Sequence, residues 1–191
     1  MNTSPKKNAA FPDHPIDDSL TIGATNQNAN QQPENQALVQ SDQDFSELGR
    51  ILIAEDSTFD FRYLVSCLKN AGIKSSITWV EDGSELISFL EGKGSYEDRN
   101  LDDISLVLLD LKMPKMDGLA ALEHIRNSPN KKIKNLPIVV LTTSTFEADL
   151  RQANELGITD YIIKPETKKE TSLMIEDMQK IFRTIIENES R

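Results

Sequence analysis

The sequence predicts a doubly wound α/β fold, in which a five-stranded parallel sheet carries helices on both of its faces. Five short, nearly continuous apolar runs alternate along the chain with segments of helical periodicity. Strands that are apolar throughout, rather than at every second residue, are typical of a parallel sheet buried on both faces. The alternation of strand and helix patterns is typical of βαβ units. Both patterns begin near residue 50, so a single domain is expected over residues 49–191.

The predicted strands are the apolar runs, and the predicted helices fill the stretches between them. The strands cover residues 50–54, 76–80, 104–110, 136–142 and 160–164. The first helix begins at a capping-box pattern formed by Ser57 and Asp60, and Gly72 ends it. Its apolar residues recur at helical spacing: Leu64, Cys67, Leu68 and Ala71. The other helices are predicted at residues 84–92, 118–127, 147–157 and 167–188.

The first 48 residues differ in composition from the rest of the chain. They include the polar run ATNQNANQQPENQ and only two aromatic residues, Phe11 and Phe45. Such a segment cannot bury enough apolar surface to offset its conformational entropy. Residues 1–48 are therefore predicted to form a disordered, Asn/Gln-rich tail.

Composition and charge exclude several classes of protein. No stretch approaches the roughly 18 apolar residues of a membrane span, and no secretory signal is present, so a soluble protein without a membrane partner is expected. Cys67 is the only cysteine, which excludes an internal disulfide and a cysteine-based zinc site and suits the cytoplasm. The formal net charge of −10 disfavours binding to nucleic acid.

Polar residues follow the predicted strands at the points where ligands bind in open parallel sheets. The first strand ends in Glu55 and Asp56, the third in Asp110, the fourth in Thr142 and the fifth in Lys164. Three carboxylates that meet at one edge repel one another unless a cation holds them. Oxygen ligands with room for water suit Mg²⁺, and a neighbouring ammonium and hydroxyl suit a phosphoryl group.

These motifs together resemble the receiver domain of two-component response regulators, over residues 50 to about 188. The matching motifs are the acidic pair Glu55-Asp56, the aspartate in LLDLKMPKMDG, Thr142 in VVLTTS, Tyr161 and Lys164-Pro165. Five separated motifs in the correct order are far more specific than any one of them. The resemblance implies a flavodoxin-like strand order, 2-1-3-4-5.

The resemblance also implies a role for each residue. Asp110 would be the nucleophile that takes a phosphoryl group from a phosphohistidine on a sensor kinase. Asp56, Asp110 and the backbone carbonyl of Lys112 would bind Mg²⁺, and Glu55 would act largely through a bound water. Lys164 would pair with one phosphoryl oxygen and Thr142 with another, and Tyr161 would turn inward when Thr142 moves.

Two long connections, one between the second helix and the third strand and one before the fourth strand, indicate a subgroup of receiver domains. The stretches GKGSYEDRNLDD and NSPNKKIKNLP exceed what a minimal receiver needs. They are similar to those of single-domain regulators paired with phytochrome-type bacterial sensor kinases. No output domain is expected after the last helix, so the chain is expected to pass on its signal by protein contact or onward phosphotransfer. The expected catalysis is limited to the chain's own phosphoryl transfer and slow dephosphorylation. The basic run KKIK is expected to be a solvated loop.

Two apolar stripes on the last predicted helix leave the oligomeric state open. The first consists of Met174, Met178, Ile181 and Ile185, and the second of Ile175, Phe182 and Ile186. If one stripe stays exposed, it predicts a homodimer through the face of the fourth helix, fifth strand and fifth helix. If both face the sheet, they form one wide core-facing stripe.

Two functions from other classes compete with the receiver. A phosphatase of the haloacid-dehalogenase type also uses a strand-end aspartate, but it needs a second aspartate two positions later, where this chain has Lys112. A pseudo-receiver would act as a scaffold without phosphorylation and usually lacks acidic-pair, nucleophile or lysine residues. This chain has them all, so the pseudo-receiver is the second hypothesis.

Overall fold

The computed structural model describes residues 48–143 and 147–189, which all belong to one compact unit, Gln43–Arg191. Its five strands form a sheet of order β2-β1-β3-β4-β5 in which every neighbouring pair is parallel. The strands are β1 (Arg50–Ala54), β2 (Ile77–Val80), β3 (Ile104–Asp110), β4 (Ile138–Thr142) and β5 (Asp160–Ile163). The predicted fold class and strand order are confirmed. The predicted tail lies outside the described residues except for Leu48, which is buried.

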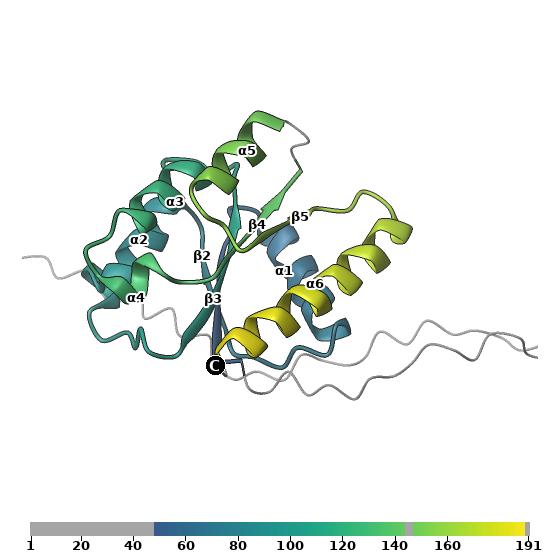
Figure 1. The fold of residues 1–191 in the computed structure, drawn as a ribbon, viewed down its shortest axis with the longest axis horizontal. Coiled ribbons are helices and arrows are strands. Elements are labelled where there is room, and N and C mark those ends of the chain that lie inside the picture. Colours follow the sequence, from purple (N-terminus) through teal and green to yellow (C-terminus); the bar gives the residue numbers. More distant parts are fainter. Residues whose placement is uncertain (1–47, 144–146, 190–191) are drawn as a thin grey trace, which may run out of the picture. The chain divides into compact units, whose positions relative to one another are not determined.

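The helices cover both faces of the sheet, as Figure 1 shows. They are α1 (Thr58–Asn70), α2 (Gly83–Glu91), α3 (Gly118–Arg126), α4 (Lys131–Lys134), α5 (Glu147–Glu155) and α6 (Lys168–Glu189), with a 3₁₀ turn, η2 (Gly94–Tyr96). Alternate strand residues point to opposite faces. On β1, Ile51 and Ile53 pack in a core with α1 and α6, whereas Leu52 and Ala54 pack in a core with α2, α3 and α5. Within the described residues, no helix has the length and apolarity to cross a bilayer.

One expectation needs correction, and one open alternative is decided. The run KKIK is not a solvated loop but the one-turn helix α4, because Asn130 caps it and Ile133 is buried against the core. On α6, the whole first stripe and Phe182 are buried, and Ile175 and Ile186 pack partly buried against the same core. Both stripes therefore face the sheet. The exposed apolar side chains in this region are instead Tyr161 and Ile163 of β5 and Leu173 of α6.

The loop that follows β3 is anchored to the start of α2. Lys115 in this loop has a positive φ of 62°, and its Nζ lies 2.5 Å from Oδ2 of Asp82. The other carboxylate oxygen of Asp82 caps α2 by accepting from the Glu85 N–H at 2.8 Å. Asp82 is buried, and burial alone would raise its pKa, but the hydrogen bonds from Lys115 and Glu85 outweigh burial and lower the pKa below its usual value. Asp82 therefore joins two loops that flank the carboxyl edge of the sheet.

We expect Asp82→Asn to lower stability in a pH-dependent way. A carboxylate whose pKa is lower in the folded state stabilises above its unfolded pKa, and the stabilisation is lost as pH falls through the folded value. The difference in urea midpoint between wild type and Asp82→Asn should therefore be full at pH 7 and should shrink as the pH falls below the usual aspartate pKa and through the lowered folded pKa of Asp82. Asp82→Ala also removes the helix cap and should cost at least about 1 kcal/mol at pH 7.

Asp117 provides a matched control for this experiment. It caps α3 by accepting from the Ala120 N–H at 2.8 Å, and it makes no ion pair within the described part of the chain. Asp117→Asn keeps a capping acceptor, so its urea midpoint should follow that of wild type across the acid range. A pH-independent difference for Asp82→Asn would contradict the assigned ion pair.

Candidate functional site

The carboxyl edge of the sheet brings the predicted polar residues together. Glu55 and Asp56 follow β1, Asp110 ends β3, and Lys164 follows β5. Parallel register places Asp110 opposite Leu141, so Thr142 lies one residue further along the same edge on β4. Glu55 and Asp110 are only 1% and 5% exposed, and Thr142 is fully buried. Burial of charged groups requires paired partners, which the site provides.

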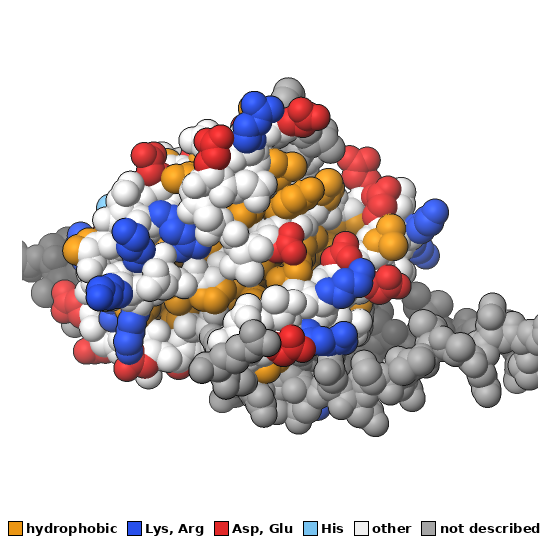
Figure 2. All heavy atoms as spheres, in the orientation of Figure 1, with side chains coloured by type: hydrophobic (Ala, Val, Ile, Leu, Met, Phe, Trp, Pro, Cys, Tyr) orange, Lys and Arg blue, Asp and Glu red, His pale blue; other side chains and the backbone are white. Residues whose placement is uncertain are grey.

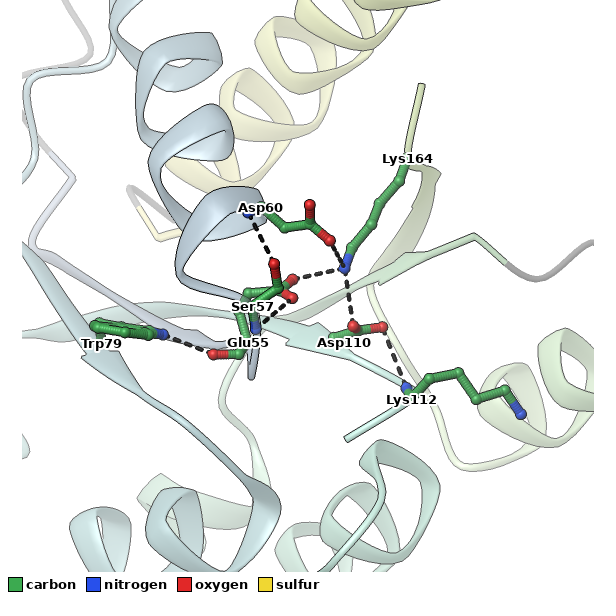
Figure 3. A network of polar contacts seen from close by, with 7 residues as sticks. All are labelled: Glu55, Ser57, Asp60, Trp79, Asp110, Lys112 and Lys164. Atoms are coloured by element: carbon green, nitrogen blue, oxygen red, sulfur yellow. Dashed lines mark hydrogen bonds and ion pairs between the residues drawn. The ribbon is translucent and has the colours of Figure 1, made fainter. Parts of the chain in front are cut away.

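Lys164 is the centre of the polar network in Figure 3. Its Nζ donates to Oε2 of Glu55 at 2.6 Å and to Oδ2 of Asp110 at 2.8 Å. A third carboxylate, Asp60 on α1, approaches Nζ to 3.5 Å. The Lys112 N–H donates to the other oxygen of Asp110 at 3.2 Å. Both oxygens of Asp110 are thereby held in fixed directions at the end of β3.

Lys164 and Glu55 both have a pKa above the usual value, for different reasons. Burial raises the pKa of Glu55, and the contacts with Lys164 offset only part of this effect. Burial would lower the pKa of Lys164, but hydrogen bonds to Asp110 and Glu55 outweigh it and raise the pKa above its usual value. Lys164 therefore remains an ammonium at neutral pH. Its contribution to stability is lost only as the pH rises through this raised value.

Three carboxylates at this edge fit a divalent cation. Glu55, Asp56 and Asp110 each offer an oxygen, and these oxygens lie within 4.8 Å of one another. Asp56 is exposed, which leaves one side of the cluster open to solvent. An all-oxygen donor set with access for water is typical of sites for hard cations such as Mg²⁺ and Mn²⁺. The predicted acidic cluster is thus assembled by the fold.

The backbone of Glu55 is held by a residue that the sequence analysis did not single out. Trp79 on β2 donates from Nε1 to the Glu55 carbonyl oxygen at 2.7 Å. Its indole ring stacks on Phe61 of α1, with ring centroids 4.6 Å apart and planes at 10°. Because Ile53 pairs with Trp79 in the sheet, the indole lies beside the end of β1. Trp79 thus connects β2, α1 and the acidic pair.

Lys112 and Thr142 lie beside this cluster, and Tyr161 does not. In Figure 3 the Lys112 side chain extends away from Lys164, and its Nζ bonds Oδ2 of Asp149 on α5 at 2.9 Å. The Thr142 carbonyl accepts from the Lys164 N–H at 2.8 Å, which joins the ends of β4 and β5. Tyr161 lies apart from the cluster, on β5, and is 40% exposed.

Sequence reasoning missed three contacts in this region: Trp79 with Glu55, Asp149 with Lys112, and Asp60 with Lys164. Two of these contacts, Asp149 with Lys112 and Asp60 with Lys164, are ion pairs between residues that only the tertiary fold brings together. Asp60 was recognised only as half of a capping box. The single tryptophan at the end of a predicted strand was the one available signal for the Glu55 contact.

Comparisons with known proteins find a matching family model and several similar proteins. The family model described as the response regulator receiver domain matches residues 51–176. The chain is 35% identical over 132 residues to the response regulator Rcp1 of Synechocystis, a match that covers 69% of this chain and 87% of Rcp1. It is 32% identical to the probable methanogenesis regulatory protein FilR2 of Methanothrix harundinacea, over 69% of this chain and 82% of FilR2.

Solved structures give the same result. The Mn²⁺-bound form of Rcp1 matches with a TM-score of 0.61 and 34% identity, over 69% of this chain and 91% of that one. The phosphorylated cyanobacterial phytochrome response regulator RcpA matches with a TM-score of 0.60 and 31% identity, over 70% of this chain and 90% of that one.

Proposed function

The chain belongs to the response regulator receiver family, and from this premise we propose that Asp110 accepts a phosphoryl group from the phosphohistidine of a sensor histidine kinase. The observation that carries the proposal is the buried carboxylate of Asp110, paired with Lys164 at 2.8 Å beside two further carboxylates. In the transfer, an Asp110 oxygen bonds to phosphorus as the bond from phosphorus to the imidazole nitrogen breaks, and the imidazole keeps the electron pair. Receiver domains are signalling proteins rather than classical enzymes, so we expect this chain to catalyse only its own phosphorylation and slow dephosphorylation.

The resident cation in this proposal is Mg²⁺. The receiver's acidic cluster binds a divalent metal, and the similar Rcp1 structure is a Mn²⁺-bound form. Asp56, Asp110 and the backbone carbonyl of Lys112 would hold Mg²⁺ directly, and Glu55 would reach it through water. When bound, the cation offsets the negative charge that gathers on the transferring phosphoryl group. Lys164 and Thr142 would orient the phosphoryl oxygens from the opposite side.

Intact-protein mass spectrometry tests the function directly. The wild-type chain is incubated with a small acyl-phosphate donor, with and without Mg²⁺. We expect the mass of one phosphoryl group to be added only with Mg²⁺, and the adduct to be stable in acid and labile in base, as an acyl phosphate is. If no mass is added to folded protein that binds Mg²⁺, the chain acts as a pseudo-receiver scaffold instead.

Signalling in this proposal follows from the added charge. A phosphoryl group brings about 1.5 to 2 negative charges and three acceptor oxygens to the edge of the sheet. Thr142 and Lys164 would move toward it, and Tyr161, now 40% exposed, would turn inward behind Thr142. This motion is a shift between two populated states of the same fold. Partners would sense it by protein contact or by accepting the phosphoryl group.

Lys112 is expected to lengthen the life of the phosphorylated state. It follows Asp110 by two residues, and its Nζ bonds Oδ2 of Asp149 on α5. We propose that this bridge hinders the approach of a hydrolytic water. We expect Lys112→Asn to speed loss of the phosphoryl mass about threefold or more, because asparagine is too short to keep the bridge. Thr143→Ala should act in the same direction by removing bulk beside Thr142. Lys132→Asn, at a remote ion pair with Asp102, is the control and should decay as wild type does. Unchanged decay in both test variants would contradict this role.

The kinase partner is proposed to be of the phytochrome type. Receiver domains pair with histidine kinases, and several similar structures are regulators of phytochromes, including RcpA and the bacteriophytochrome response regulator RtBRR, which is 31% identical with a TM-score of 0.58. The net charge of −10 supports a protein partner rather than nucleic acid.

The buried free thiol of Cys67 is compatible with a cytoplasmic location, which we also propose.

A homodimer through the α5, β5 and α6 face is a further part of this proposal. Tyr161, Ile163 and Leu173 are exposed apolar side chains there, beside a hollow of about 610 Å³, and Figure 2 shows apolar side chains gathered along β5 between α5 and α6. β5 is also an edge strand of the sheet. Light scattering coupled to size-exclusion chromatography should find a two-chain mass. A monomer in both phosphorylation states would remove the dimer.

A further inference from the structure

Asp60 departs from the capping geometry that its position in the sequence predicts. Ser57 caps α1, and its Oγ accepts from the Asp60 N–H at 3.2 Å, which is one half of a capping box. In the other half, the acid at the third helical position would accept from the N–H of the capping residue. Here the Ser57 N–H donates to Oε1 of Glu55 at 3.2 Å instead. The carboxylate of Asp60 is thereby directed toward Lys164, as Figure 3 shows.

Lys164 therefore faces three carboxylates with its three N–H donors. The distances from Nζ are 2.6 Å to Glu55, 2.8 Å to Asp110 and 3.5 Å to Asp60. Glu55 and Asp110 also belong to the cluster that fits a divalent cation, and Asp60 does not. When Glu55 and Asp110 interact with a cation and a phosphoryl group, Asp60 is the one of these three carboxylates that keeps its contact with Lys164.

We propose that Asp60 is a positioning residue that keeps the Lys164 ammonium directed at the phosphoryl group during transfer. This inference rests on the function proposed above and adds a residue outside the motifs that define the site. The Lys164 side chain is only 14% exposed, whereas that of Asp60 is 41% exposed, so solvent screens the pair in part. The expected effect of Asp60 on rate is accordingly moderate.

A double-mutant cycle on the rate of phosphoryl uptake tests whether Asp60 acts through Lys164. At saturating Mg²⁺, Asp60→Asn should slow uptake from the acyl-phosphate donor about three- to fivefold, and Asp60→Glu should restore most of the rate. In a Lys164→Met background, Asp60→Asn should slow uptake no further, because the partner is gone. Equal losses in both backgrounds would overturn the proposal.

Glu166 separates this role from a general effect of charge. Its side chain lines the same hollow as Asp60 and Lys164 but makes no ion pair with Lys164 within the described residues. Glu166→Gln removes one negative charge from this hollow and should leave the rate of phosphoryl uptake unchanged. If it slows uptake as much as Asp60→Asn does, the negative charge around the hollow explains both effects and the positioning role is wrong.

Urea unfolding of the same variants gives a second test that needs no phosphorylation. The coupling between Asp60→Asn and Lys164→Met in the urea midpoint should be larger with Mg²⁺ than without it, because the cation then competes for Glu55 and Asp110. Additive midpoints in both conditions would overturn the proposal. If wild type takes up no phosphoryl group, the proposed function fails separately, and the unfolding cycle alone decides whether Asp60 positions Lys164.

Discussion

Asp110→Asn is expected to reduce phosphoryl uptake by at least about 10³-fold, to the background of the mass measurement. The carboxylate oxygen is the proposed nucleophile, and the amide that replaces it is a poor one. Asparagine has nearly the same shape, and its oxygen can still accept from the Lys112 N–H or from Lys164. The loss of uptake should therefore occur in a fully folded protein.

The Asp110→Asn protein should also be at least as stable as wild type in the absence of a cation. Three carboxylates lie close together at this edge, and removing one negative charge relieves their repulsion. Asp117→Asn serves as the control, since this aspartate belongs to the same sequence stretch but is exposed and caps α3. It should take up the phosphoryl group as wild type does. A base-labile adduct on Asp110→Asn would place the acceptor on another carboxylate.

Gly118→Ala is expected to destabilise the protein by about 2–3 kcal/mol and to impair phosphoryl uptake at the same time. A Cβ at Gly118 would lie 2.2 Å from the Asp110 carbonyl oxygen and 2.7 Å from the Leu111 Cα. Both atoms belong to the backbone, so no side-chain rotation can relieve the overlap. The peptide that carries the nucleophile must move instead. Urea unfolding measures the first effect, and phosphoryl uptake by the folded fraction measures the second.

Gly94→Ala is the comparison for Gly118→Ala. A Cβ at Gly94 would meet no atom within 4 Å, but the residue has a φ of +62°. This substitution should cost only about 1 kcal/mol, from backbone strain alone, and should not change uptake. If Gly118→Ala were no more harmful than Gly94→Ala, the close approach of α3 to Asp110 would be wrong.

The sequence was sufficient to predict the sheet and the gathering of the acidic residues and Lys164 at its carboxyl edge, because those features depend on local patterns. Apolar runs such as residues 104–110 identify buried strands, and the carboxyl ends of parallel strands meet at one edge whatever the details of packing. Short elements gave no such signal. α4 has one turn and a single buried residue, Ile133, so no periodicity could distinguish it from a basic loop.

Contacts between distant residues were the other feature that local patterns could not predict. Asp60 carries a strong local signal for a capping box, yet the Ser57 N–H bonds Glu55, and Lys164 is 104 residues away along the chain. On α6, the sequence left open whether one apolar stripe would stay exposed, and in the structure both stripes pack in the core that α6 shares with α1 and the sheet. In both cases tertiary geometry decided between locally equivalent outcomes.

The contact between Trp79 and Glu55 places an intrinsic fluorescent probe beside the acidic cluster. Trp79 is the only tryptophan, so all indole emission comes from this one ring. Its N–H bonds the carbonyl of a residue in the acidic cluster, and its face lies on Phe61 of α1. Any rearrangement of Glu55 changes the polarity around the excited indole and with it the intensity and wavelength of fluorescence. We therefore expect that cation binding and phosphoryl transfer can be followed by Trp79 fluorescence in a stopped-flow instrument, without attaching a dye to the chain.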